Sequence, residues 1–118
     1  MKALIIDDEI DTCFVLSGIL KQKNFASDCV NTLGDAANKL AKEQPGIVFL
    51  NNHLPDGRGI DFVEHIRKTS KDIKIVLIGA YETTVTERIN AMNKGVDLFI
   101  GKPFTTEAIN QSVDRLIA

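Results

Sequence analysis

Hydrophobic residues along this chain fall into short continuous runs separated by longer stretches with helical spacing. The runs at 3–6 (ALII), 47–50 (IVFL), 74–78 (KIVLI) and 98–100 (LFI) are almost wholly aliphatic, which favours strands covered on both faces. A shorter and more polar segment at 27–30 is a weaker strand candidate. The pattern therefore predicts five strands.

The stretches between and after these runs place apolar residues three or four positions apart, as amphipathic helices do. Five helices are predicted, and their apolar positions are Ile10, Phe14, Ile19 and Leu20; positions 33, 36, 37, 40 and 41; Ile60, Val63 and Ile66; Val85, Ile89 and Met92; and Ile109, Val113 and Leu116. Thr84 and Glu87 fit a capping box at the start of the fourth helix, and Lys94-Gly95 fits its end.

This alternation predicts an α/β fold, a doubly wound, five-stranded parallel sheet with five helices distributed over its two faces. The loops are short, so residues 1–118 are expected to form one domain. In open sheets of this kind, sites form at the carboxyl ends of the strands. The residues that follow the strands are therefore the ones to inspect for function.

Composition narrows the function classes. Charged residues make up 25% of the 118 residues, and the net charge is −2 with an isoelectric point near 5.6, which argues against direct nucleic-acid binding by this domain. No apolar run approaches membrane-spanning length, and Met1 leads straight into a strand. Cys13 and Cys29 form no metal-binding motif and are expected to be buried, reduced thiols, which favours a cytoplasmic protein.

Candidate functional residues follow four of the predicted strands. Asp7, Asp8 and Glu9 follow the first, Asn51 the third, Gly79-Ala80 the fourth and Lys102-Pro103-Phe104 the fifth. Because the carboxyl ends of parallel strands meet at one edge of a sheet, we expect two adjacent carboxylates, an amide and a lysine to line one crevice.

In this order, the DD pair, the LPDGRG loop at 54–59 and the KPF triplet at 102–104 resemble the receiver domain of bacterial response regulators, the CheY-like family. The resemblance covers the whole chain and implies a flavodoxin-like fold. It also implies a role in a two-component phosphorelay signal transduction system.

The resemblance assigns roles to several positions. Asp7 and Asp8 match the acidic pair that holds Mg²⁺, together with the backbone carbonyl of His53. Lys102 matches the lysine that pairs with the phosphoryl group, and Pro103 matches a proline usually preceded by a cis peptide. Phe99 matches an aromatic residue that changes rotamer on activation, although simple core packing explains a Phe there equally well.

Two positions depart from the family pattern. The phosphoacceptor aspartate of the family corresponds to Asn51, whose neutral amide should not attack a phosphorus atom. The hydroxyl residue that relays the change to the aromatic corresponds to Gly79, while Ala80 keeps the small residue expected next. The loss of a third negative charge should weaken Mg²⁺ binding and leave Lys102 less strongly paired.

These departures predict a receiver that signals by protein–protein contact without its own phosphorylation, and not an enzyme. The implied partners are a sensor histidine kinase or another signalling protein, and a second copy bound through the fourth helix, the strand at 98–100 and the last helix. Two alternatives remain open. One is an ordinary receiver in which Asn51 replaces a native aspartate, and the other, more remote, is a Mg²⁺-dependent phosphohydrolase.

Overall fold

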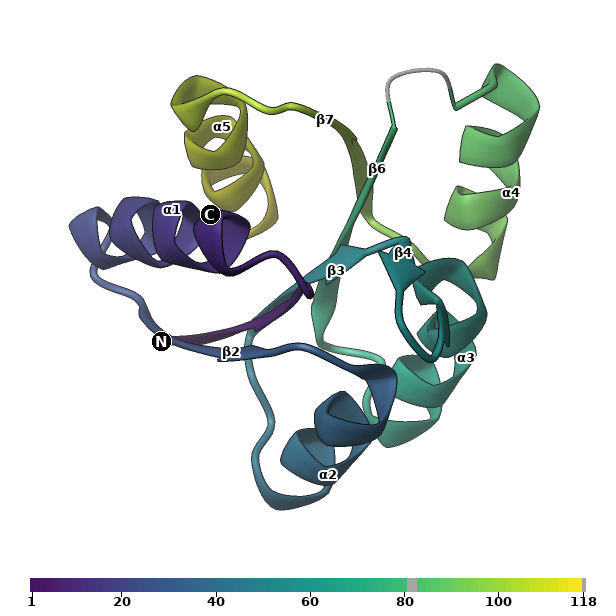
Figure 1. Cartoon of the computed structure of the whole chain (residues 1–118), viewed down its shortest axis with the longest axis horizontal. Coiled ribbons are helices and arrows are strands. Elements are labelled where there is room, and N and C mark those ends of the chain that lie inside the picture. Colours follow the sequence, from purple (N-terminus) through teal and green to yellow (C-terminus); the bar gives the residue numbers. More distant parts are fainter. Residues whose placement is uncertain (81–82, 118) are drawn as a thin grey trace.

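A central parallel sheet lies between two layers of helices in the computed structural model, which describes residues 1–80 and 83–117 (Figure 1). The strand order in the sheet is β2-β1-β3-β6-β7, and every neighbouring pair is parallel. These strands are β1 (Lys2–Ile6), β2 (Ala26–Val30), β3 (Ile47–Asn51), β6 (Lys74–Ala80) and β7 (Leu98–Lys102). The predicted five-stranded parallel sheet is confirmed.

The five helices divide between the two faces of the sheet (Figure 1). They are α1 (Ile10–Gln22), α2 (Leu33–Lys42), α3 (Gly59–Thr69), α4 (Val85–Lys94) and α5 (Thr106–Leu116). Helices α1 and α5 cover one face, where Leu16 and Ile109 pack with Ile5. Helices α2, α3 and α4 cover the other, which contains Leu4 and Ile66. Successive strand residues point to opposite faces, so the continuous apolar runs fill both cores.

The ends of α4 follow the chemistry predicted from the sequence. The Thr84 hydroxyl accepts a hydrogen bond of 3.1 Å from the backbone N–H of Glu87. Gly95 ends the helix in the left-handed region, with φ of 112°, and its N–H bonds to the carbonyl groups of the last turn. A side chain at Gly95 would be strained there, which is why glycine suits this position.

The loop after β3 contains a small hairpin that the sequence analysis missed. Its two antiparallel strands are β4 (His53–Leu54) and β5 (Gly57–Arg58). At its tip, the carboxylate of Asp56 accepts hydrogen bonds of 2.9 and 3.0 Å from the backbone N–H groups of Leu33 and Gly34. These bonds hold the pKa of Asp56 below its usual range. The LPDGRG segment is thus anchored to the first turn of α2.

Several apolar residues at helical spacing face solvent and not the core. Phe14 and Ile10 on α1 are about 80% exposed, and Val85, Ile89 and Met92 form an exposed row on α4. The buried residue of α4 is Ala91. The spacing of the exposed apolar residues on α1 and α4 correctly predicted helices, but these residues form a solvent-exposed face and not a buried one. No helix in the described part of the chain is long and apolar enough to cross a bilayer.

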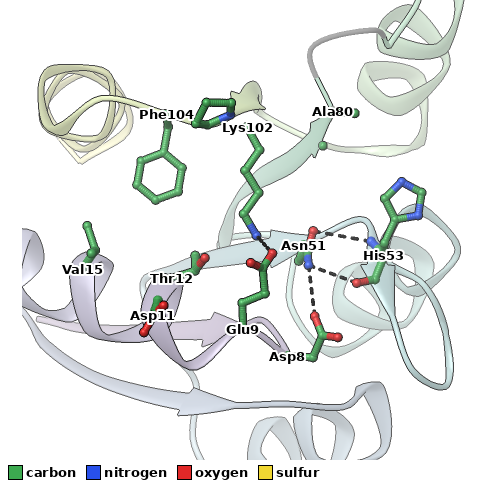
Figure 2. Close-up of a pocket in the computed structure, with 12 residues that line it drawn as sticks. Asp8, Glu9, Asp11, Thr12, Val15, Asn51, His53, Ala80, Lys102 and Phe104 are labelled. Atoms are coloured by element: carbon green, nitrogen blue, oxygen red, sulfur yellow. Dashed lines mark hydrogen bonds and ion pairs between the residues drawn. The ribbon is translucent and has the colours of Figure 1, made fainter.

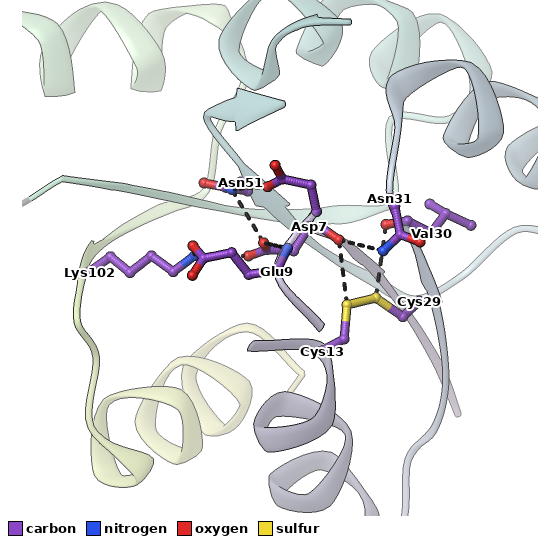
Figure 3. The surroundings of a disulfide bond; sticks show 9 residues. Asp7, Glu9, Cys13, Cys29, Val30, Asn31, Asn51 and Lys102 are labelled. Carbon is purple, nitrogen blue, oxygen red and sulfur yellow. Dashed lines mark hydrogen bonds and ion pairs between the residues drawn. A yellow bond between two sulfur atoms is a disulfide. The ribbon is translucent and has the colours of Figure 1, made fainter. Parts of the chain in front are cut away.

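The expectation that both cysteines are reduced thiols is wrong for this structure. Cys13 on α1 and Cys29 on β2 form a disulfide, with Cα atoms 6.0 Å apart (Figure 3). The two residues lie sixteen positions apart, but the packing of α1 beside β2 brings their side chains together on one face of the sheet. The helix–strand packing that pairs them is not visible in cysteine spacing alone.

Reduction of this disulfide is expected to lower the free energy of unfolding by about 3 kcal/mol, because it releases a loop of roughly sixteen residues in the unfolded chain. Denaturant unfolding with and without a reductant measures the difference. The variant Cys13→Ser is the control, and its midpoint should not respond to the reductant. Two thiols that react with an alkylating reagent in the unfolded, unreduced protein would contradict the bond.

Candidate functional site

The carboxyl ends of β1, β3, β6 and β7 border an open pocket at one edge of the sheet (Figure 2). Apolar side chains of Val15 and Phe104 form one wall, and polar groups form the floor. The predicted site residues that line it are Asp8, Asn51, His53, Gly79, Ala80, Lys102 and Pro103. The structure therefore brings the strand-end residues together as expected.

Asp7 is the buried charge of this site, with only 1% of its surface exposed. Its carboxylate accepts a hydrogen bond of 2.9 Å from the backbone N–H of Glu9 and pairs with the Lys102 ammonium at 3.2 Å. Its backbone carbonyl accepts a hydrogen bond of 2.8 Å from the side-chain amide of Asn31 (Figure 3). Burial raises the pKa of Asp7, and the Glu9 N–H and Lys102 offset that effect only in part.

Lys102 has a second carboxylate partner that the sequence analysis missed. Its ammonium lies 2.6 Å from a carboxylate oxygen of Glu9 (Figure 2). Burial alone would lower the pKa of Lys102, but the ion pairs with Glu9 and Asp7 outweigh it and the pKa is raised. Lys102 therefore has two carboxylate partners, Asp7 and Glu9, while Asn51 adds no charge; that this leaves Lys102 less strongly paired stays a prediction.

Asn51, at the end of β3, is 5% exposed, and its two amide hydrogens are shared among three oxygen atoms. Its Nδ2 lies 3.0 Å from the carbonyl oxygen of His53, 3.4 Å from Asp7 Oδ1 and 3.5 Å from Asp8 Oδ1. Its Oδ1 faces the backbone N–H of His53 at 3.5 Å. The predicted metal ligands thus surround the amide of Asn51, and Figure 2 shows its hydrogen bonds to Asp8 and His53.

The backbone after Lys102 also agrees with the sequence prediction. The peptide bond between Lys102 and Pro103 is cis. Pro103 and Phe104 then line the same pocket as Asn51. The KPF triplet therefore supplies both the cation of the site and part of its apolar wall.

Gly79 and Phe99 are close neighbours on adjacent strands. A Cβ atom added at Gly79 would lie 3.0 Å from Cζ and 3.2 Å from Cε2 of the Phe99 ring, closer than ordinary van der Waals contact. The guanidinium of Arg88 lies over the half-buried ring, 4.8 Å from the ring centroid. Phe99 thus occupies space that exists because position 79 has no side chain.

Comparison with known proteins identifies the fold and its motifs. The family model of the response regulator receiver domain matches residues 3–114. This chain is a response regulator receiver domain. Its five-stranded parallel sheet and its five helices are those of the CheY-like fold.

The receiver is similar to regulators of different overall size. It is 27% identical over 117 residues to the transcriptional regulatory protein TctD of Salmonella typhimurium. The match covers 99% of this chain and 52% of TctD. The chain thus spans about half the length of that relative. A two-component response regulator from Clostridium difficile has 29% identity and a TM-score of 0.92, with 99% and 95% of the two chains covered.

A third similar protein is the beryllofluoride-activated NtrC4 receiver domain, whose solution structure is a dimer. It has 28% identity and a TM-score of 0.91, and the match covers 98% of this receiver and 94% of that chain. Family membership establishes a receiver domain of two-component response regulators. The roles of Asn51, Gly79 and Phe99 in this receiver remain predictions.

Sequence reasoning placed most of the site but missed three residues that shape it. Glu9 pairs with Lys102, Asn31 holds the Asp7 carbonyl, and Arg88 covers Phe99. Glu9 directly follows the DD pair, so its nearness was visible in the sequence. Arg88 lies on an exposed helix face, where a charged residue is ordinarily solvated, so no sequence signal distinguished it.

Substitution Gly79→Ser is expected to displace the Phe99 ring, since the added Cβ meets the ring at about 3.0 Å. The free energy of unfolding should fall by about 1 to 3 kcal/mol, the usual cost of overpacking. Denaturant unfolding gives the energy, and nuclear Overhauser contacts between Phe99 and β6 report the ring position. Gly18→Ser is the control, because a Cβ there meets nothing within 4 Å. An unmoved ring in Gly79→Ser would refute the steric coupling.

Proposed function

We propose that this receiver takes part in two-component signalling by protein–protein contact, without phosphorylation of its own chain. The observation that supports the proposal is Asn51, a neutral amide at the end of β3 in the position matched to the phosphoacceptor aspartate. Formation of an acyl phosphate needs an ionised carboxylate that attacks the phosphorus atom. An amide oxygen is uncharged, and its nitrogen lone pair is delocalised. Asn51 therefore has no nucleophile to offer.

Gly79 supports the proposal from a second position. It matches the residue whose hydroxyl would bond a phosphoryl group, and glycine has no hydroxyl. In its place, the Phe99 ring packs against the Gly79 backbone. The site thus lacks the nucleophile and the relay, while Asp7, Asp8 and Lys102 are retained. The missing third carboxylate also weakens the predicted Mg²⁺ site, and we assign this domain no enzymatic activity.

Incubation with Mg²⁺ and a small-molecule phosphodonor should leave the intact mass of the protein unchanged. The variant Asn51→Asp, treated in parallel, tests whether the rest of the crevice is competent. A phosphoryl adduct on the variant alone means that asparagine by itself prevents the reaction. An adduct on a carboxylate of the Asn51 protein would overturn the proposal.

An alternative proposal is an ordinary phosphorylatable receiver in which Asn51 replaces a native aspartate. Asn differs from Asp by one group of nearly the same size, so the fold would tolerate the exchange. Gly79 counts against it, because exchange at position 51 gives no reason for a second loss at position 79. The codon for position 51 in the native gene decides between the two. A phosphohydrolase is a weaker alternative, because DDEID at 7–11 lacks the alternating aspartates of such enzymes.

The surface made by α4, β7 and α5 is the contact face we propose. Val85, Ile89 and Met92 project from α4 into solvent, and exposed apolar rows of this kind suit protein contacts. A second copy of this chain, a sensor histidine kinase or another signalling protein is the expected partner. The similar NtrC4 receiver is a dimer. We propose a cytoplasmic location, typical of response regulators, and no direct nucleic-acid binding by this domain.

Substitution Ile89→Glu should weaken self-association at least about tenfold, because it places a charge in the centre of the apolar row. Sedimentation equilibrium over a concentration series measures the dissociation constant. Phe14→Glu is the matched control, since Phe14 is also an exposed apolar residue but lies on α1, which is not part of the proposed surface. Equal effects of both substitutions would show that the α4 row is not the contact face.

A further inference from the structure

Three oxygen atoms lie around the side-chain amide of Asn51, and Figure 2 shows two of them, on Asp8 and His53. The three atoms are Oδ1 of Asp7, Oδ1 of Asp8 and the backbone carbonyl oxygen of His53, at 3.4, 3.5 and 3.0 Å from Nδ2. Carboxylate and carbonyl oxygens are the ligands that Mg²⁺ prefers. The space they surround is filled by a hydrogen-bond donor.

This arrangement does not fit a bound divalent cation. The amide nitrogen of Asn51 has no lone pair for a metal ion, and its hydrogens point at the oxygens that would be the ligands. Rotation of the amide by half a turn would place Oδ1 against the same three oxygens. It would also set Nδ2 against the backbone N–H of His53, which Oδ1 now faces. The hydrogen-bond network therefore favours the present orientation.

The charges around Asn51 also have partners without a cation. Asp7 is the buried carboxylate, and it already has the Lys102 ammonium, the Glu9 N–H and the Asn51 amide. Asp8 and Glu9 are exposed, so water screens their charges. Among residues 1–80 and 83–117, no group of three or more His, Cys, Asp or Glu side chains is arranged to hold a metal ion.

We propose that the Asn51 amide is a built-in substitute for the divalent cation, so that the crevice keeps its geometry without metal. This goes further than a site weakened by one missing charge. In that simpler view, the cation binds less tightly because the attraction is smaller. Here the amide competes with the cation for the same three oxygens. The two explanations differ in what happens when the amide is removed without adding a charge.

The variant Asn51→Ala separates them. It frees the three oxygens and adds no negative charge, so it should bind Mg²⁺ at least about tenfold more tightly than the native chain if the amide blocks the ion. Asn51→Asp should bind more tightly still, because it also adds a charge. Asp72→Asn, an exposed acidic residue away from the crevice, is the control and should behave as the native chain does.

Isothermal titration with Mg²⁺ and thermal unfolding with Mg²⁺ or a chelator give two readouts. The native midpoint should stay within about 1 °C, while the midpoints of Asn51→Ala and Asn51→Asp should rise by several degrees with metal. Mg²⁺ affinity of Asn51→Ala no greater than that of the native chain would overturn the inference. Native affinity equal to that of Asn51→Asp would also overturn it, because the amide would then have yielded to the ion.

This inference uses Asn51, as the proposed function does, but the two fail separately. The titration contains no phosphodonor, so it reports metal binding alone. A native chain that binds Mg²⁺ tightly and still gains no phosphoryl group would refute the substitute cation and leave the proposed function intact. A native chain that ignores Mg²⁺ but gains phosphate would refute the function and leave the substitute intact.

Discussion

Compensation of the buried Asp7 carboxylate is the constraint on which the rest of the site depends. An ionised carboxylate removed from water costs several kcal/mol unless it is paired and hydrogen-bonded. Its partners come from the ends of two strands and the turn that follows β1: Lys102 on β7, Asn51 on β3 and the N–H of Glu9. These groups reach one carboxylate because the parallel strands end at a similar level. The register of the parallel strands therefore determines which groups can compensate the Asp7 charge.

Asn51 and Gly79, the two residues that we propose depart from the family pattern, are both accommodated by their neighbours. Around Asn51, the neighbouring oxygens accept hydrogen bonds from the amide. At Gly79, the missing side chain leaves space that the Phe99 ring occupies, and Arg88 lies over that ring. Neither position is left as a void or as an unpaired polar group. Together they describe a crevice whose interactions are completed within the protein.

The sequence predicted the parallel sheet, the five helices and the convergence of Asp8, Asn51 and Lys102 at one edge. It could do so because apolar runs and the residues that follow them are visible in the local sequence, without knowledge of how distant segments pack. What it missed depends on packing between distant segments. The pairing of Cys13 with Cys29 depends on the packing of α1 beside β2. The contact between Glu9 and Lys102 depends on how the ends of β1 and β7 are placed relative to each other. The exposed row on α4 has the same periodicity as a buried one.

Helix α4 has a further property that follows from how little of it is buried. In the segment Val85–Lys94 the buried side chain is Ala91, the smallest apolar residue after glycine. Apolar burial is what makes local opening costly, so the free energy that holds α4 to the sheet is small compared with that of its neighbours. Amide protons of α4 should therefore exchange with solvent sooner than those of α1 or α3. The helix best suited to meet a partner is also the one whose structure a partner could most easily reshape.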